Sequence, residues 1–193
     1  GVTGVQTCAL PISAPQKMQV LVLVGSLGAK PLNAMLPLAL AQVHQAVPGL
    51  CVIHQTGQAE VEAVRQAYQS NGVEAQVLAF IEDMPKAYDE TRLVVARAGA
   101  TTCSELTALG IPSVLIPFPQ AADDHQTQNA KELQEAGAAV VVAQKDLTPE
   151  RLAGIVQRLI LDLKTLETMA NKARQIGKSN AADIVAKKVL ELC

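Results

Sequence analysis

Short apolar runs alternate along the chain with longer segments in which apolar residues recur every three or four positions. Runs such as Gln19–Val24 and Leu93–Ala96 resemble strands that are buried on both faces of a sheet. The longer segments are typical of amphipathic helices. This alternation predicts an α/β fold, a Rossmann-like doubly wound parallel sheet of about six strands. The expected strands are Gln19–Val24, Leu50–Gln55, Val73–Phe80, Leu93–Ala96, Ser113–Pro117 and Ala138–Ala143.

Residues that start or stop helices mark several boundaries between these segments. Asn71 and Gly72 follow one helical segment as a C-terminal stop, and Pro149 stands at the first position of another. Two further helices are expected at the end of the chain. The predicted helices are Pro31–Ala46, Ala59–Ser70, Met84–Asp89, Thr102–Leu109, Asp124–Ala136, one that begins at Pro149, Leu163–Ala173 and Ala181–Leu192.

The first residues of the chain do not follow this pattern. Residues 2–13, VTGVQTCALPIS, resemble the in-frame translation of a sequencing-library adaptor. They lack the basic segment and the long apolar stretch of a signal peptide. We therefore expect a non-native or disordered leader at 1–15, an α/β domain at 16–162 and C-terminal helices at 163–193. Such an adaptor also implies that an N-terminal half of the protein was lost from the sequence.

Composition and charge argue against several classes of protein. The chain has 193 residues and 49% apolar content, which suit a single core. Its net charge of -2 argues against nucleic-acid binding through a basic field. No apolar run is long enough to predict a membrane span. The four cysteines form no C-x-x-C pair, so the sequence predicts no zinc site and suits a reducing cytoplasm.

A glycine-containing loop, Gly25-Ser26-Leu27-Gly28, follows the first expected strand and precedes a helix. Main-chain N–H groups in such a loop can hold a diphosphate. A tight turn between a strand and a helix also requires glycine when no ligand binds. The loop alone therefore leaves both interpretations open.

A second candidate segment begins the helix that follows the fourth expected strand. The small residues Ala100, Thr101 and Thr102 allow a ligand to approach the backbone, where the helix dipole favours phosphate. The Glu105 carboxylate can accept both hydroxyls of a ribose, or it is an ordinary acid near a helix start. Arg97 either approaches phosphate or supports the loop.

A third candidate segment follows the fifth expected strand. His125, Gln126 and Asn129 share one face of a helix start. Amide side chains suit sugar hydroxyls because they both donate and accept hydrogen bonds. Alternatively, His125 is an ordinary surface residue and Asp123 is only an N-cap.

These segments, together with Phe80-Ile81-Glu82-Asp83-Met84, occur in the order found in one known family. From about Val20 to its end, the chain resembles the C-terminal half of the MurG family of bacterial glycosyltransferases. These enzymes add N-acetylglucosamine (GlcNAc) to lipid I in peptidoglycan synthesis. The resemblance implies one half of a GT-B glycosyltransferase, the half that binds the donor UDP-GlcNAc. Val24 and Leu27 depart from the family, which usually has a further glycine at the first position and a polar residue at the second.

The resemblance also implies roles for individual residues. The Gly25 loop would hold the diphosphate, the main chain of Ile81 would recognise the uracil edge, and Glu105 would accept the ribose hydroxyls. Gln126 and Asn129 would bind the hydroxyls of the sugar. The predicted substrate-binding residues are Gly25, Ser26, Gly28, Ile81, Ala100, Thr101, Thr102, Glu105, His125, Gln126 and Asn129.

The implied reaction is an inverting transfer, in which the lipid I hydroxyl attacks C1 of the donor sugar and UDP departs. We expect no metal or other cofactor, because helix-dipole and main-chain donors can stabilise the leaving diphosphate. No catalytic residue is expected in this chain, since the base would lie in the N-terminal half. This half alone is expected to bind UDP-GlcNAc weakly and to be inactive. The complete enzyme would be a peripheral protein on the cytoplasmic face of the inner membrane, without a nucleic-acid partner.

Two alternatives stay open at this point. The donor-binding half of another GT-B UDP-sugar transferase would keep the Gly25 loop and Glu105 and would differ around His125 to Asn129. A non-catalytic subunit would instead work with a partner chain that supplies the acceptor site.

Overall fold

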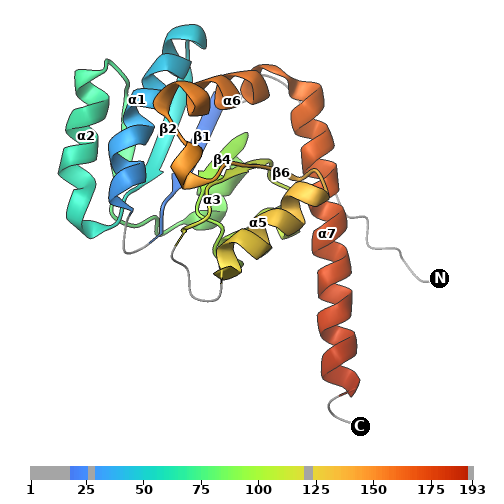
Figure 1. Cartoon of the computed structure of the whole chain (residues 1–193). Helices are drawn as coiled ribbons and strands as arrows, with labels where there is room; N and C mark the ends of the chain where they lie inside the picture. The colour runs from blue at the N-terminus through green and yellow to red at the C-terminus, as the bar shows by residue number, and fades with distance from the viewer. Residues whose placement is uncertain (1–17, 26–28, 120–123, 191–193) are drawn as a thin grey trace.

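A six-stranded parallel sheet with helices on both faces forms the centre of the protein (Figure 1). The structure is a computed structural model that describes residues 18–25, 29–119 and 124–190, with only the backbone for 178–190. The strands are β1 (Met18–Leu23), β2 (Leu50–Gln55), β3 (Ala75–Leu78), β4 (Leu93–Ala96), β5 (Ser113–Leu115) and β6 (Ala139–Val141). They lie in the order β3-β2-β1-β4-β5-β6 and pair in parallel. This order confirms the Rossmann-like doubly wound fold.

All six strands occur where the apolar runs predicted them. β2 and β4 have the expected bounds, whereas β3, β5 and β6 are shorter than expected. The register explains the difference for β3, whose ladder with β2 runs only from the pair Val52 and Ala75 to the pair Gln55 and Leu78. Apolar side chains thus continue beyond the hydrogen-bonded part of the strand.

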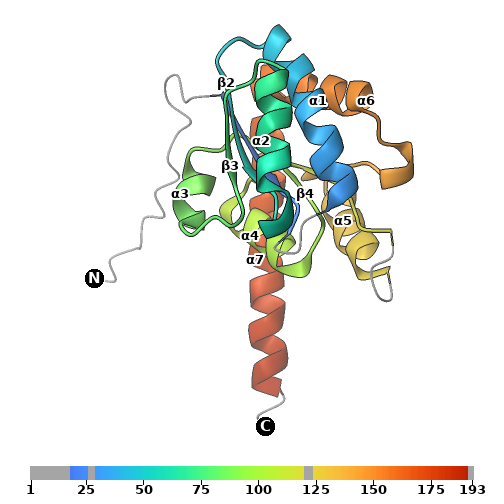
Figure 2. The same cartoon turned by 90° about the vertical axis from the view of Figure 1, so that its left-hand side faces the viewer.

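The helices divide between the two faces of the sheet. Residues of α1 (Lys30–Ala46), α2 (Val61–Ser70) and α6 (Pro149–Leu161) contribute to the apolar cluster on one face. Residues of α3 (Met84–Asp89), α4 (Ala100–Leu109) and α5 (His125–Glu135) contribute to the cluster on the other. Figure 2 shows α3 on one side of the strands and α1 and α6 on the other. A 3₁₀ turn, η1 (Gln58–Glu60), occupies the start of the expected helix Ala59–Ser70.

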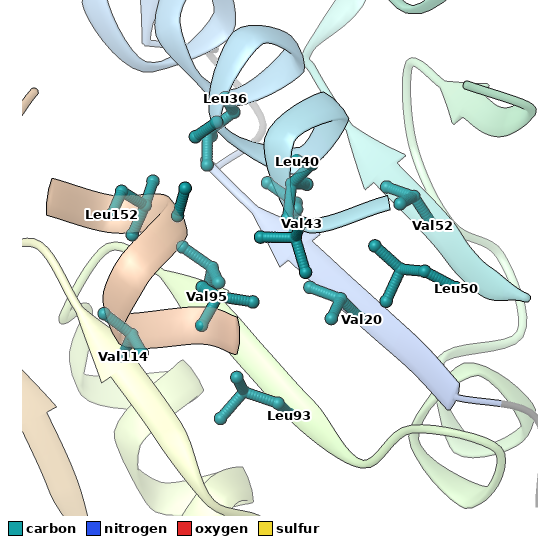
Figure 3. Packing of buried hydrophobic residues seen from close by; sticks show 14 of the residues in the cluster. Val20, Leu36, Leu40, Val43, Leu50, Val52, Leu93, Val95, Val114 and Leu152 are labelled. Atoms are coloured by element: carbon teal, nitrogen blue, oxygen red, sulfur yellow. The ribbon is translucent and has the colours of Figure 1, made fainter. Parts of the chain in front are cut away.

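Branched apolar side chains fill the space between the sheet and α1. Val20 of β1 and Val95 of β4 lie beneath Leu40 of α1, and Leu152 of α6 closes the side of the cluster (Figure 3). These four side chains are at most 1% exposed. Their close packing fixes the strands, and therefore the loops at the strand ends, relative to the helices.

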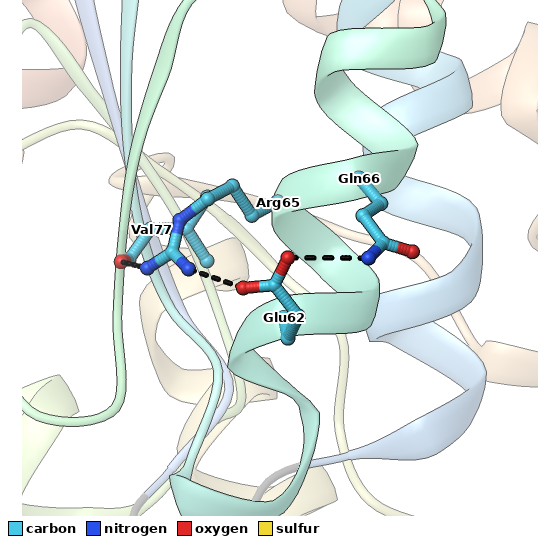
Figure 4. Close-up of polar contacts among 4 residues, drawn as sticks. All are labelled: Glu62, Arg65, Gln66 and Val77. Carbon is cyan, nitrogen blue, oxygen red and sulfur yellow. Dashed lines mark hydrogen bonds and ion pairs between the residues drawn. The ribbon is translucent and has the colours of Figure 1, made fainter.

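Helix α2 is tied to the edge strand β3 by polar contacts on its exposed side. Arg65 Nη2 donates to the Val77 carbonyl at 3.4 Å, and its Nη1 pairs with Glu62 at 2.5 Å (Figure 4). Gln66 Nε2 donates to the other oxygen of Glu62 at 3.2 Å. Because these groups are largely exposed, the ion pair contributes little to stability.

The chain ends in one continuous helix, α7 (Leu163–Leu190), so the predicted break between two C-terminal helices is wrong. Figure 1 shows α7 passing the edge of the sheet and extending beyond the rest of the domain. Gly177 lies in the interval where we expected the break. A Cβ there would lie 2.7 Å from the Thr107 carbonyl oxygen of α4, so glycine permits two helices to approach closely.

The first half of α7 belongs to this domain. Leu166, Met169, Ala170 and Ala173 are buried. Leu166 and Met169 belong to one of the two sheet clusters, and Ala173 belongs to the other. That the C-terminal helices also pack on a further domain stays a prediction. The expected leader at 1–15 lies outside the described residues. In the part of the chain that is described, no helix has the length and apolar content needed to cross a membrane.

Candidate functional site

The predicted site residues that the structure describes follow the carboxyl ends of the strands, and the strand order reverses at this edge, between β1 and β4. Leu23 pairs with Ala96, and the Arg97 N–H donates to the Leu23 carbonyl at 3.1 Å. Gly25 and the start of α4 therefore leave the sheet side by side at its carboxyl edge. Doubly wound sheets bind ligands in the crevice at this position.

Gly25 has a φ of +91°, in the region that favours glycine, and it is exposed. The turn itself therefore accounts for a glycine at this position. Ser26 and Gly28, which we also expected to hold a diphosphate, lie outside the described residues. The phosphate-binding role of the loop stays a prediction.

Helix α4 begins at the carboxyl end of β4 without a side-chain cap. Its N-cap is Gly99, which has no side chain that could accept a hydrogen bond from the N–H groups of the first turn. Ala100 and Thr101 are exposed and Thr102 is half-buried. Uncapped N–H groups and the positive end of the helix dipole favour an anion here. The geometry therefore agrees with the predicted position of a diphosphate.

Glu105 is half-buried on α4, and Tyr88 of α3 contacts it. The Tyr88 hydroxyl donates to Glu105 Oε2 at 2.8 Å. Burial, followed by the hydrogen bond to Glu105 and its charge, raises the pKa of Tyr88. The phenol thus stays protonated and acts as a donor. Tyr88 was not predicted, because nothing in the sequence indicates that α3 and α4 bring these residues together.

Ile81 follows β3 and has a buried side chain, 5% exposed. Its N–H donates to Gln55 Oε1 at 3.0 Å, and Gln55, the last residue of β2, is itself buried. The amide that we expected to face uracil therefore has a partner within the protein. Gln55 was missed because a lone glutamine at a strand end carries no distinctive signal.

The two amide residues of α5 brace the neighbouring loops. Asn129 Nδ2 donates to the Ala98 carbonyl at 3.0 Å, and Gln126 Oε1 accepts from the Phe118 N–H at 3.0 Å. Each uses one end of its amide for this contact. His125 is exposed beside them, at the first position of α5. Asn129 therefore contacts the segment just before α4, and Gln126 contacts the segment that follows β5.

Arg97 supports the loops of the site from within the protein. Its guanidinium donates to the carbonyls of Ile116 and Pro117, each at 3.1 Å, and to Gln144 Oε1 at 2.6 Å. It also lies over the Phe118 ring, 5.3 Å from its centroid. Burial lowers the pKa of Arg97. Of the two roles considered for this residue, the structure favours support of the loop.

A cavity of about 410 Å³ lies elsewhere, next to the start of β6 and between α6 and α7. Val140, Leu159 and Met169 are among its apolar lining residues, and Arg158 and Asp162 are among its polar ones. It includes none of the predicted site residues.

Among the described residues, no three His, Cys, Asp or Glu side chains gather as metal ligands would.

Comparison with known proteins identifies the family. The profile of the glycosyltransferase family 28 C-terminal domain matches residues 19–187. The chain belongs to this family.

Several curated relatives carry the same name. A UDP-N-acetylglucosamine-N-acetylmuramyl-(pentapeptide) pyrophosphoryl-undecaprenol N-acetylglucosamine transferase of Aromatoleum aromaticum is 49% identical over 180 residues. The alignment covers 93% of this chain and 49% of that protein. A protein of the same name from Marinobacter nauticus is 47% identical over 175 residues, covering 91% of this chain and 48% of the relative. The chain therefore spans about half the length of these relatives.

Solved structures confirm the fold. Acinetobacter baumannii MurG matches with a TM-score of 0.75 and 42% identity, over 88% of this chain and 52% of that one. The glycosyltransferase VinC in complex with dTDP matches with a TM-score of 0.65 and 26% identity, over 92% of this chain and 42% of that one. This family 28 domain is therefore an α/β unit of the GT-B type, similar to one half of these enzymes.

Proposed function

We propose that this family 28 domain is the donor-binding half of an inverting transferase that moves GlcNAc from UDP-GlcNAc to lipid I. The main support is that the predicted site residues which the structure describes follow strands at the carboxyl edge, where β1 and β4 lie side by side. The names of relatives that are 42–49% identical support the choice of donor and acceptor.

The donor would lie across the start of α4. Its diphosphate would meet the uncapped N–H groups after Gly99, and its ribose would meet the Glu105 carboxylate. The uracil ring would lie toward Ile81, whose main-chain N–H already donates to Gln55. Uracil would then either displace Gln55 from this N–H or pair with a main-chain carbonyl of the segment around Ile81.

The sugar would lie toward α5. Asn129 and Gln126 use one end of each amide to brace loops, and the other end of each amide takes no part in these two contacts. A GlcNAc donor offers hydroxyl and acetamido groups that suit such ends. This arrangement predicts selectivity for the N-acetyl sugar.

During transfer, negative charge develops on the departing UDP. The helix dipole and the N–H groups of α4 would stabilise that charge without further reorganisation. Activation of the lipid I hydroxyl would require a base on the half that the relatives have in addition. The complete enzyme would work at the cytoplasmic face of the membrane, where its lipid acceptor is anchored.

Calorimetric titration of the 193-residue chain, with circular dichroism to verify folding, tests this proposal. We expect UDP-GlcNAc to bind more tightly than UDP-glucose, and Glu105→Ala to weaken both about ten- to a hundredfold. Asn129→Ala should reduce the preference for the N-acetyl sugar. Equal binding of both sugars would favour another UDP-sugar transferase, and tighter binding of dTDP than UDP would contradict a uridine site.

A further inference from the structure

We propose that Tyr88 is a positioning residue that orients the Glu105 carboxylate toward the ribose hydroxyls of the nucleotide. The proposal rests on the donor-binding function proposed above. Its basis is the hydrogen bond from the Tyr88 hydroxyl to Glu105 Oε2, 2.8 Å long, which joins α3 to α4 beside the carboxyl edge of the sheet.

Tyr88 is itself held firmly. Its side chain is 5% exposed and packs in the cluster that includes Leu106 of α4. At the start of α3, Asp83 accepts a hydrogen bond from the Lys86 N–H at 3.1 Å. Toward its end, Gln19 of β1 donates to the Ala87 carbonyl at 3.4 Å. The phenol therefore has a fixed position relative to the sheet.

Without a partner that holds its carboxylate, a half-buried glutamate side chain can adopt several rotamers. Ordering that side chain when a ligand binds costs affinity. One hydrogen bond from a fixed phenol limits those rotamers before the ligand arrives. The carboxylate has about four acceptor positions, so one contact with Tyr88 leaves enough for two hydroxyls. Because burial and the nearby Glu105 raise the pKa of Tyr88, the phenol stays protonated and keeps the proton that it donates to the carboxylate.

Helix α3 also connects two parts of the site. It begins at Met84, shortly after Ile81, whose N–H is held by Gln55. The segment proposed to hold the base and the carboxylate proposed to hold the ribose are therefore linked through one short helix. Loss of the phenol oxygen should affect recognition of the ribose hydroxyls and leave the contacts with base and phosphate intact.

Titration of the 193-residue chain with UDP and with 2′,3′-dideoxy-UDP tests this role. We expect Tyr88→Phe to weaken UDP binding about three- to tenfold and to change dideoxy-UDP binding by less than about twofold. In a Glu105→Gln background, the same substitution should have little further effect. Tyr68→Phe is the matched control, since Tyr68 is equally buried but packs on the opposite face of the sheet.

The outcomes distinguish failure of the Tyr88 role from failure of the proposed donor-binding function. Equal weakening of both nucleotides by Tyr88→Phe, or an equal loss in Tyr68→Phe, would show a general structural effect and overturn the role of Tyr88 alone. If the unmodified chain does not bind UDP, or binds UDP and dideoxy-UDP equally, the ribose role of Glu105 fails and this proposal fails with it.

Discussion

Gly177 of α7 lies directly against the carbonyl of Thr107 in α4. A Cβ at position 177 would lie 2.7 Å from the Thr107 oxygen and 3.0 Å from the Ala108 nitrogen. The three nearest neighbours are all backbone atoms, so a side chain there would push the helices apart. The terminal helix thus docks on the helix that carries Glu105.

Gly177→Ala should lower the free energy of unfolding by about 1–2 kcal/mol, because overpacking outweighs the better helix propensity of alanine. Urea denaturation measures the change. The matched control is Gly154→Ala in α6, where a Cβ would meet nothing within 4 Å. That control should stabilise the protein by up to about 1 kcal/mol, and stabilisation by both substitutions would contradict the close contact.

Stability should depend on pH through His54, which is buried completely. Its Nε2 contacts Asn33 Oδ1 at 3.1 Å, which requires a proton on Nε2, so Nδ1 accepts from the Tyr68 hydroxyl at 3.0 Å. Burial lowers the pKa of His54 from 6.5 to about 3. Below pH 6.5 the unfolded chain therefore binds a proton that the folded chain does not.

The free energy of unfolding should consequently fall by about 1.4 kcal/mol per pH unit as the pH drops from about 6.5 toward 3. His54→Gln should remove this part of the slope, although it lowers stability at neutral pH. Denaturant titrations of both proteins across this range measure the difference. Parallel stability curves for the two proteins would show that His54 is not the group responsible.

Replacement of Arg97 should affect stability through the loops that it holds. Arg97→Ala would leave the buried carbonyls of Ile116 and Pro117 without their donor, at a cost of about 3 kcal/mol. Arg65→Ala, which removes an exposed ion pair, should cost less than about 1 kcal/mol. Thermal or urea unfolding measures the stability that each variant loses. Losses of similar size in the two variants would argue against a supporting role for Arg97.

The strands and most helices could be predicted because their signals are local. Uninterrupted apolar runs indicate buried parallel strands, and proline and glycine mark helix ends, as Pro149 and Gly110 do. Gly177 is the exception, since its effect on packing depends on a carbonyl about seventy residues earlier in the chain. A glycine needed for close approach looks the same in sequence as one that ends a helix.

The position of the candidate site could also be predicted, because strand ends in a parallel sheet share one edge. The hydrogen bonds between residues within the site could not be predicted. The contacts of Gln55 with Ile81 and of Tyr88 with Glu105 join residues that lie 26 and 17 positions apart. Each contact depends on how two elements pack, and periodicity within one element carries no information about it.

Mapping of backbone amide shifts by NMR during a titration with UDP tests the central claim most directly. The donor-binding account predicts that the largest changes occur at Ile81, at residues 99–102 and at Glu105. Changes concentrated at residues 137–140 and 158–169, around the cavity beside β6, would contradict it. So would a folded chain whose spectrum is unchanged by UDP at millimolar concentration.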